Sequence, residues 1–140
     1  MAGKADFTED EWKGLQQGVT GAGMLVSTAH RDFTDSFREA STVAKQLAAH
    51  RESESQLVRE LSGTHGTGFG LVASPKEIVK GTIDVLAAAV AVLGVKAPDE
   101  VEPYRGLVLD VATAVAEAKG GVKDEEQAAI DRITAALGAV

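Results

Sequence analysis

Four short stretches of the chain share one pattern, in which a Ser, Thr or Asp is followed three residues later by Glu or Gln. They are FTEDEW from Phe7, SESQ from Ser53, SPKE from Ser74 and DEEQ from Asp124. In such a capping box the two side chains satisfy backbone donors at the start of a helix. No stretch of alternating β-branched residues bounded by turns accompanies them. The pattern therefore predicts a chain built from short, individually capped helices.

The first helix is expected to begin at Thr8, where Glu11 closes the capping box and Phe7 can pack against Trp12. Four glycines follow, and each weakens a helix by about 1 kcal/mol relative to alanine. We therefore expect this helix to break near Gly21. Either a second helix crosses close to the glycines, which is the commoner use, or their backbone approaches a ligand. The four glycines are Gly14, Gly18, Gly21 and Gly23.

The remaining helices follow from apolar periodicity and from the other start signals. They are expected from about Asp35 to Arg51, from Ser53 to Gly63, from Ser74 to Gly94 with Pro75 at the first position, from about Asp99 to Lys119, and from Asp124 to Gly138. Pro103 lacks a backbone donor, so the fifth helix can instead begin near Glu102. The fourth becomes apolar on all sides, which is typical of a central helix. The prediction is an all-α fold, a single bundle of about six helices over residues 1–140, with a glycine-rich loop at about 63–73.

Composition narrows the classes of function. The formal charge of −7 is spread evenly, with 7 basic and 10 acidic side chains in residues 1–60 and 7 and 11 in residues 61–140, so no basic face for nucleic acid is expected. The longest apolar run, residues 85–95, is too short to span a bilayer. The N-terminus has no secretory pattern, which favours a cytoplasmic protein. Aromatic residues are only 4% and cysteine is absent, so we expect an aliphatic core, no thiolate chemistry and no zinc or iron–sulfur site that needs cysteine. No cofactor is expected.

The run VATAVAEAKGGVKDEEQAAIDRITAALG, residues 111–138, resembles the C-terminal helix–loop–helix of the TerB-like (tellurite-resistance) domains, whose loop reads Ala-Asp-Gly, a hydrophobic residue, a polar cap and a Glu. FTEDEW also looks like the start of a bacterial branch related to that family. The resemblance implies an all-helical bundle with a two-fold repeat. Residues 24–48, which again read as helix, acidic loop and helix, suggest a degenerate copy. The matching residues are Ala118, Gly120 or Gly121, Val122, Asp124 and Glu126.

The same resemblance implies that acidic residues from two equivalent loops bind a divalent cation, because Ca²⁺ and Mg²⁺ prefer oxygen ligands. At two positions the sequence departs from the family's loop, and both departures argue against a metal site in this chain. Lys119 stands where the family has its loop Asp, and His30 or Arg31 stands at the equivalent place in the first loop. Acids at the start of a helix also complement its dipole without any metal. The candidate ligands are Asp32, Asp35, Glu39 and Glu126.

No catalytic constellation stands out. The histidines at 30, 50 and 65 form no HExxH pair, and the glycines at 63–70 lack both the Gly-Lys-Ser/Thr ending of a phosphate loop and the preceding strand of a dinucleotide fingerprint. Asp84 and Asp110 lie in otherwise apolar helices, where we expect them on the solvent side, because charged residues are almost never fully buried unless paired. The sequence therefore predicts no catalytic residue and no enzyme.

The expected function is that of a non-enzymatic helical domain acting through a protein partner or self-association. The TerB resemblance implies a bacterial stress-response or envelope-associated assembly. Two alternatives stay open: an acidic domain that binds Ca²⁺ or Mg²⁺, and a small enzyme with an unrecognised site. The expected interaction surface combines glycines of the first helix with the later loop, namely Gly14, Gly18, Gly21, Gly66, Gly68 and Phe69.

Overall fold

The computed structural model describes residues 4–29, 45–46, 48–53, 55–62, 75–118 and 124–138. These ranges contain the α-helices α1 (Glu9–Ala29), α3 (Gln56–Ser62), α4 (Pro75–Lys96), α5 (Val101–Ala118) and α6 (Asp124–Gly138), and the 3₁₀ turns η1 (Lys4–Asp6) and η3 (Pro98–Glu100). The described ranges contain no strand, which confirms the all-α prediction. The helix expected from about Asp35 is described only at 45–46 and 48–49. The glycine-rich loop and most of the suggested repeat at 24–48 lie outside the described residues.

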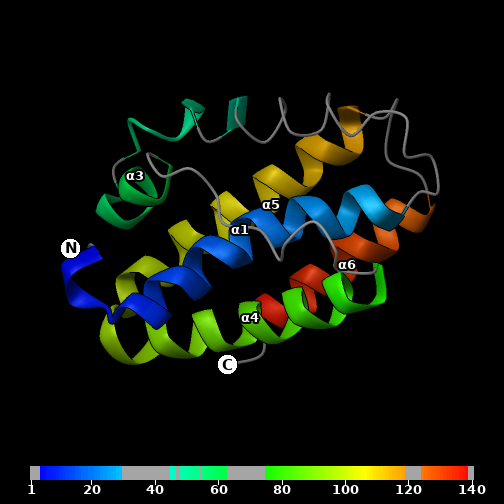
Figure 1. Cartoon of the computed structure of the whole chain (residues 1–140). Helices are drawn as coiled ribbons and strands as arrows, with labels where there is room; N and C mark the ends of the chain where they lie inside the picture. Colours follow the sequence, from blue (N-terminus) through cyan, green and yellow to red (C-terminus); the bar gives the residue numbers. More distant parts are fainter. Residues whose placement is uncertain are drawn as a thin grey trace.

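The central helix of the bundle is α1, which packs against α4, α5 and α6 (Figure 1). The prediction that α4 would be surrounded by other helices is wrong, because Asp84, Ala88 and Ala91 on one side of it are exposed. The second half of α1 is rich in glycine and alanine, and small side chains let neighbouring helices approach closely on several sides. Gly21, Ala22 and Gly23 are all buried, and the helix runs unbroken through Gly21. The expected break is absent because tertiary packing on three helices outweighs the low helix propensity of glycine.

The predicted start of α1 is confirmed. Thr8 Oγ1 accepts a hydrogen bond from the Glu11 backbone N–H at 3.1 Å, and Glu11 Oε1 accepts one from the Thr8 N–H at 2.8 Å. Phe7 packs on Trp12, with ring centroids 6.2 Å apart. Lys96, at the end of α4, donates to Glu11 Oε1 at 2.5 Å and lies 5.8 Å from the Phe7 ring centre. The capped start of α1 is thus joined to the end of its antiparallel neighbour α4.

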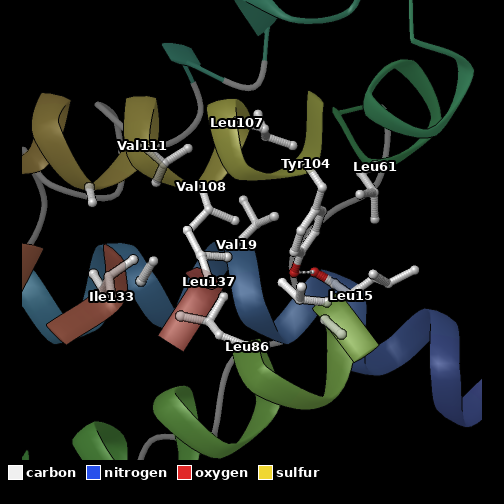
Figure 2. Close-up of a cluster of buried hydrophobic side chains, with 14 of the residues drawn as sticks. Leu15, Val19, Leu61, Leu86, Tyr104, Leu107, Val108, Val111, Ile133 and Leu137 are labelled. Carbon is white, nitrogen blue, oxygen red and sulfur yellow. Dashed lines mark hydrogen bonds between the residues drawn. The ribbon is translucent and has the colours of Figure 1, made fainter. Parts of the chain in front are cut away.

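One glycine of α1 lies directly under a side chain of α5. The Tyr104 hydroxyl donates to the Leu15 carbonyl at 2.8 Å (Figure 2). A Cβ atom added at Gly18 would collide with that hydroxyl and come within 3.0 Å of the Leu86 side chain. Burial raises the pKa of the Tyr104 hydroxyl far above its usual range. Close helix crossing, the first of the two roles considered for the glycines, is therefore the role of Gly18. Gly14 has no atom within 4 Å of the corresponding point.

The fifth and sixth helices begin close to their expected positions. α5 starts at Val101, near the later of the two predicted starts. Pro103 lies in its first turn, where a backbone N–H would have no acceptor within the helix, so the donor that proline lacks costs no helical hydrogen bond. α6 spans Asp124–Gly138 as predicted, although Asp124 is its first residue and not the cap before it. Arg105 of α5 donates from Nε and Nη2 to the Leu137 carbonyl, at 3.0 and 2.7 Å. This cation satisfies a carbonyl at the end of α6, where the helix dipole favours positive charge.

The start of α4 agrees with the prediction, whereas its end and the start of α3 differ from it. α4 begins at Pro75 as expected, but it continues two residues past Gly94 to Lys96. Gly94 is an exposed residue of the last turn and does not end the helix. α3 begins at Gln56, with Ser55 as its cap in place of the predicted Ser53. Ser55 Oγ accepts from the Val58 N–H at 3.1 Å.

The core beneath these helices is aliphatic, as the composition predicts. Its largest buried members include Leu15, Leu86, Tyr104, Leu107 and Ile133, which converge from α1, α4, α5 and α6 (Figure 2). The predicted buried face of α6 is confirmed for Ile133 and Leu137, and Ile130 is partly buried against the same core. Across the described ranges, no helix is both long and apolar enough to cross a membrane.

Candidate interaction surface

An apolar stretch of α4 faces outward from the bundle. Lys80, Asp84, Ala88, Ala91 and Val95 are all exposed, and their spacing of three or four residues places them on one side of the helix. We call this set the α4 face. Its C-terminal half has only Ala and Val, and the side chain of Val95 is 84% exposed. Val95 is the exposed large hydrophobic residue among the described side chains.

The sequence prediction missed this face because α4 was expected to be surrounded on all sides. Its opposite side is deeply buried, with Leu86, Val90 and Leu93 fully enclosed against the core. The signal that distinguishes the two sides was residue size. The enclosed side has Leu and Val, whereas the exposed side has Lys80 and Asp84 followed by two alanines. Alanine is compatible with both core and surface, so hydrophobicity alone did not separate the sides.

The predicted glycine surface is only partly described. Gly14 is half-buried with open space beside its α-carbon, so it is accessible from outside the bundle. Gly18 and Gly21 are buried between helices and do not contribute to an outer surface. Their prediction as interaction residues is wrong because the same small size that would admit a partner admits neighbouring helices instead. Gly66, Gly68 and Phe69 lie outside the described residues.

Three of the four candidate metal ligands, Asp32, Asp35 and Glu39, also lie outside the described residues. The fourth, Glu126, is in the first turn of α6 and is 0% exposed. Glu126 was interpreted from sequence as an acid that complements the helix dipole, and its position fits that interpretation, but its complete burial was not foreseen. Within the described ranges, no group of three or more His, Asp or Glu side chains is arranged to hold a metal ion.

The two carboxylates that the sequence placed on the solvent side of apolar helices are indeed exposed. Asp84 belongs to the α4 face, and Asp110 projects from α5. Asp110 Oδ2 lies 3.0 Å from His50 Nε2, with 57% of the Asp110 side chain and 25% of the His50 side chain exposed. An exposed pair of this kind contributes little to stability. It is better explained as a surface contact between the turn at 50–52 and α5.

A buried polar contact that sequence reasoning missed joins α3 to η3. Ser55 Oγ donates to Glu100 Oε2, and the Glu100 side chain is only 3% exposed. Ser55 and Glu100 are 45 positions apart in the chain, so no local pattern could have paired them. Burial of a carboxylate is costly unless hydrogen bonds replace its hydration. The Ser55 hydroxyl supplies such a bond, and the pair therefore fixes α3 against the start of α5.

Within the described ranges, the fold is a helical bundle in which the α4 face is exposed. Comparison of the chain with protein-family models, with curated proteins and with solved structures finds no match.

Proposed function

We propose that this chain is a non-enzymatic helical domain that acts through protein contacts made by the α4 face. The single observation that carries the proposal is the outward exposure of Ala88, Ala91 and Val95 on one side of a helix whose other side is fully enclosed. A contiguous exposed apolar surface is typical of sites where another helix or protein surface docks, and these three residues follow one another along one side of α4. Small side chains at the centre would let a partner helix approach closely, as α5 approaches Gly18 within the bundle.

The two ends of the α4 face differ in polarity. Lys80 and Asp84 lie at its N-terminal end, and the apolar residues lie toward Val95. An apolar centre with charged residues at its edge is the usual arrangement of a protein interface. The partner is a second copy of the chain or a different protein. The TerB resemblance of the sequence extends the proposal to a cytoplasmic, bacterial stress-response or envelope-associated assembly.

The test is a charge substitution at the centre of the face. The double variant Ala88→Glu, Ala91→Glu should keep its helix content and melting behaviour, because both positions are exposed, yet it should lose association. Sedimentation velocity of the purified chain measures self-association. Cross-linking in cells of the source organism detects a partner of different sequence, which is identified from the peptides joined to Lys80.

A matched control is available on α6, where Ala128 and Ala135 are also exposed alanines. The double variant Ala128→Glu, Ala135→Glu adds the same charge to the same fold and should leave association unchanged. Equal loss of association in both variants would point to net charge and not to the α4 face. A chain that is monomeric and yields no Lys80 cross-link in cells would sink the proposal.

A further inference from the structure

The helix α3 is attached to the bundle differently from the other helices. It has seven residues, and its main contact within the described structure is with α5, whereas α1, α4, α5 and α6 all pack on one another. Figure 1 shows it at the edge of the bundle, at the end where the N-terminus lies. A helix of this length is not stable alone, so α3 depends on its docking. The docked apolar side chains are Leu57, Val58 and Leu61, and Leu61 lies near Tyr104 (Figure 2).

The turn before α3 and the helix itself are joined by internal hydrogen bonds. Arg59 Nη1 donates to the Ser53 carbonyl at 2.7 Å, and the Ser55 N–H donates to Ser53 Oγ at 3.2 Å. The Val58 N–H donates to the Ser55 hydroxyl. These bonds make residues 50–53 and 55–62 one local unit, which we call the α3 strap. These bonds are all local to the strap, and a seven-residue helix is not stable alone, so the amides of α3 become open to exchange once it leaves its docked position.

Polar contacts on its outer and inner sides join the strap to α5 and η3. On the outside, His50 meets Asp110 of α5. On the inside, the Ser55 hydroxyl donates to the buried carboxylate of Glu100 while it also caps α3. One oxygen atom thus takes part both in docking and in the first turn of the helix. Loss of the Glu100 contact frees that hydroxyl and returns the carboxylate to water, where hydration offsets part of the apolar surface lost on undocking.

We propose that the α3 strap is a conformational device that opens from α5 and η3 as one unit while α1, α4, α5 and α6 stay folded, and that the Ser55–Glu100 contact is its latch. Opening uncovers the docked face of the strap and the side of α5 beneath it. This step is independent of the proposed role of the α4 face, which lies on a different helix.

Native-state hydrogen exchange of the full-length chain tests the opening directly. Amides of residues 59–62 should exchange at least about tenfold faster than those of residues 19–26 in the centre of α1, because a subglobal opening requires less free energy than global unfolding. Their exchange should also depend only weakly on added urea, since little surface is exposed when the strap opens. Equal rates and equal urea dependence for the two sets would show that the strap opens only by global unfolding, and this would overturn the proposal.

The latch is tested by Ser55→Ala, which removes both bonds of the hydroxyl. Exchange in residues 59–62 should rise on the order of tenfold, as for the loss of a helix cap, while residues 19–26 keep their protection. Thr134→Ala is the matched control, because it removes a hydroxyl that bonds only to the Ile130 carbonyl of its own helix. Glu100→Gln, which keeps an oxygen that accepts from Ser55, should change exchange in α3 much less than Ser55→Ala does. A similar rise in residues 19–26 and 59–62 of Ser55→Ala would contradict a separate latch.

Discussion

The hydroxyl of Tyr104 occupies the space above Gly18 that the Cβ atom of any other residue would take. The same hydroxyl donates to the Leu15 carbonyl one turn earlier in α1. A helix with several glycines is intrinsically weak, yet this one is the central element of the bundle. The contact between these two residues explains why: the missing side chain of Gly18 is the condition for burying Tyr104 against the backbone of α1.

The first prediction compares two glycines of the same helix. Gly18→Ala should destabilise the protein by about 1 to 3 kcal/mol, since the new methyl group forces Tyr104 or Leu86 to move in a packed core. Gly14→Ala should be neutral or stabilising by up to about 1 kcal/mol, because alanine favours the helix and nothing lies within 4 Å of the added atom. Urea unfolding followed by circular dichroism measures both. Equal destabilisation by the two variants would contradict the close approach at Gly18.

The second prediction concerns alkaline pH. In the unfolded chain the Tyr104 hydroxyl ionises near pH 10, whereas burial raises its pKa in the folded protein. The unfolded state therefore releases a proton that the folded state keeps, so stability is unaffected well below about pH 10 and falls as pH rises above it. Tyr104 is the single tyrosine, so tyrosinate absorbance reports it alone. That absorbance should appear only together with unfolding.

Tyr104→Phe is the control for this titration. It should lower stability at neutral pH by about 0.5 to 1.5 kcal/mol, through loss of the bond to Leu15, and should reduce the loss of stability in alkali. Tyrosinate absorbance rising near pH 10 in the wild-type protein, with its circular dichroism unchanged, would show that the hydroxyl is accessible and refute the prediction.

The third prediction concerns acid. The hydrogen bond from Lys96, helped by the backbone bond from Thr8, lowers the pKa of Glu11 below its usual value of 4.5. A lowered pKa means that the unfolded chain takes up the proton first, so the stabilisation is present above about pH 4.5 and is lost as pH falls through the lower folded value. Glu11→Gln keeps the capping box but removes the charge. The stability difference between the wild-type protein and Glu11→Gln should be largest near neutral pH and shrink in acid.

Glu9→Gln, at the first position of the same helix, is the comparison for a general effect of charge near the helix dipole. If both variants show the same pH dependence, the effect belongs to the helix dipole and not to Lys96. High salt should also reduce the Glu11 effect, because the pair is partly exposed.

The fourth prediction uses a buried hydroxyl. Thr82 on α4 is fully buried, and within the described part of the chain its Oγ1 has no hydrogen-bond partner. Thr82→Val replaces that hydroxyl with a methyl group of similar size and should stabilise the protein by about 1 kcal/mol, because burial of an unsatisfied polar group is removed. Thr20→Val is the control, since the Thr20 hydroxyl donates to the Gln16 carbonyl at 3.1 Å. Thermal unfolding of both variants measures the difference, and destabilisation by Thr82→Val would show that its hydroxyl is satisfied.

Features decided by neighbouring residues were predictable from sequence. The capping box of Thr8 and Glu11 and the start of α4 at Pro75 depend on residues within one turn, and both are found as expected. The solvent positions of Asp84 and Asp110 follow from helical periodicity and from the cost of burying charge. Local chemistry was therefore a sufficient guide to element type and to most helix starts.

Features decided by distant residues were not predictable in the same way. Burial of Glu100 depends on Ser55, and burial of Gly18 depends on Tyr104, which is 86 positions later in the chain. The central place of α1 was missed because hydrophobicity ranked α4 first, whereas the arrangement of helices was set by how closely small residues let them approach. The α4 face was missed for the same reason, because a helix expected to be central has no exposed side.

The position of Trp12 has a practical consequence for spectroscopy. It is the single tryptophan of the chain, and it is buried beside Phe7 at the end of α1 that is joined to Lys96 of α4. Its fluorescence therefore reports the contact between the start of α1 and the end of α4. A quencher that reaches Trp12 shows that these two helices have separated. The chain thus carries an intrinsic optical probe of the contact between α1 and α4.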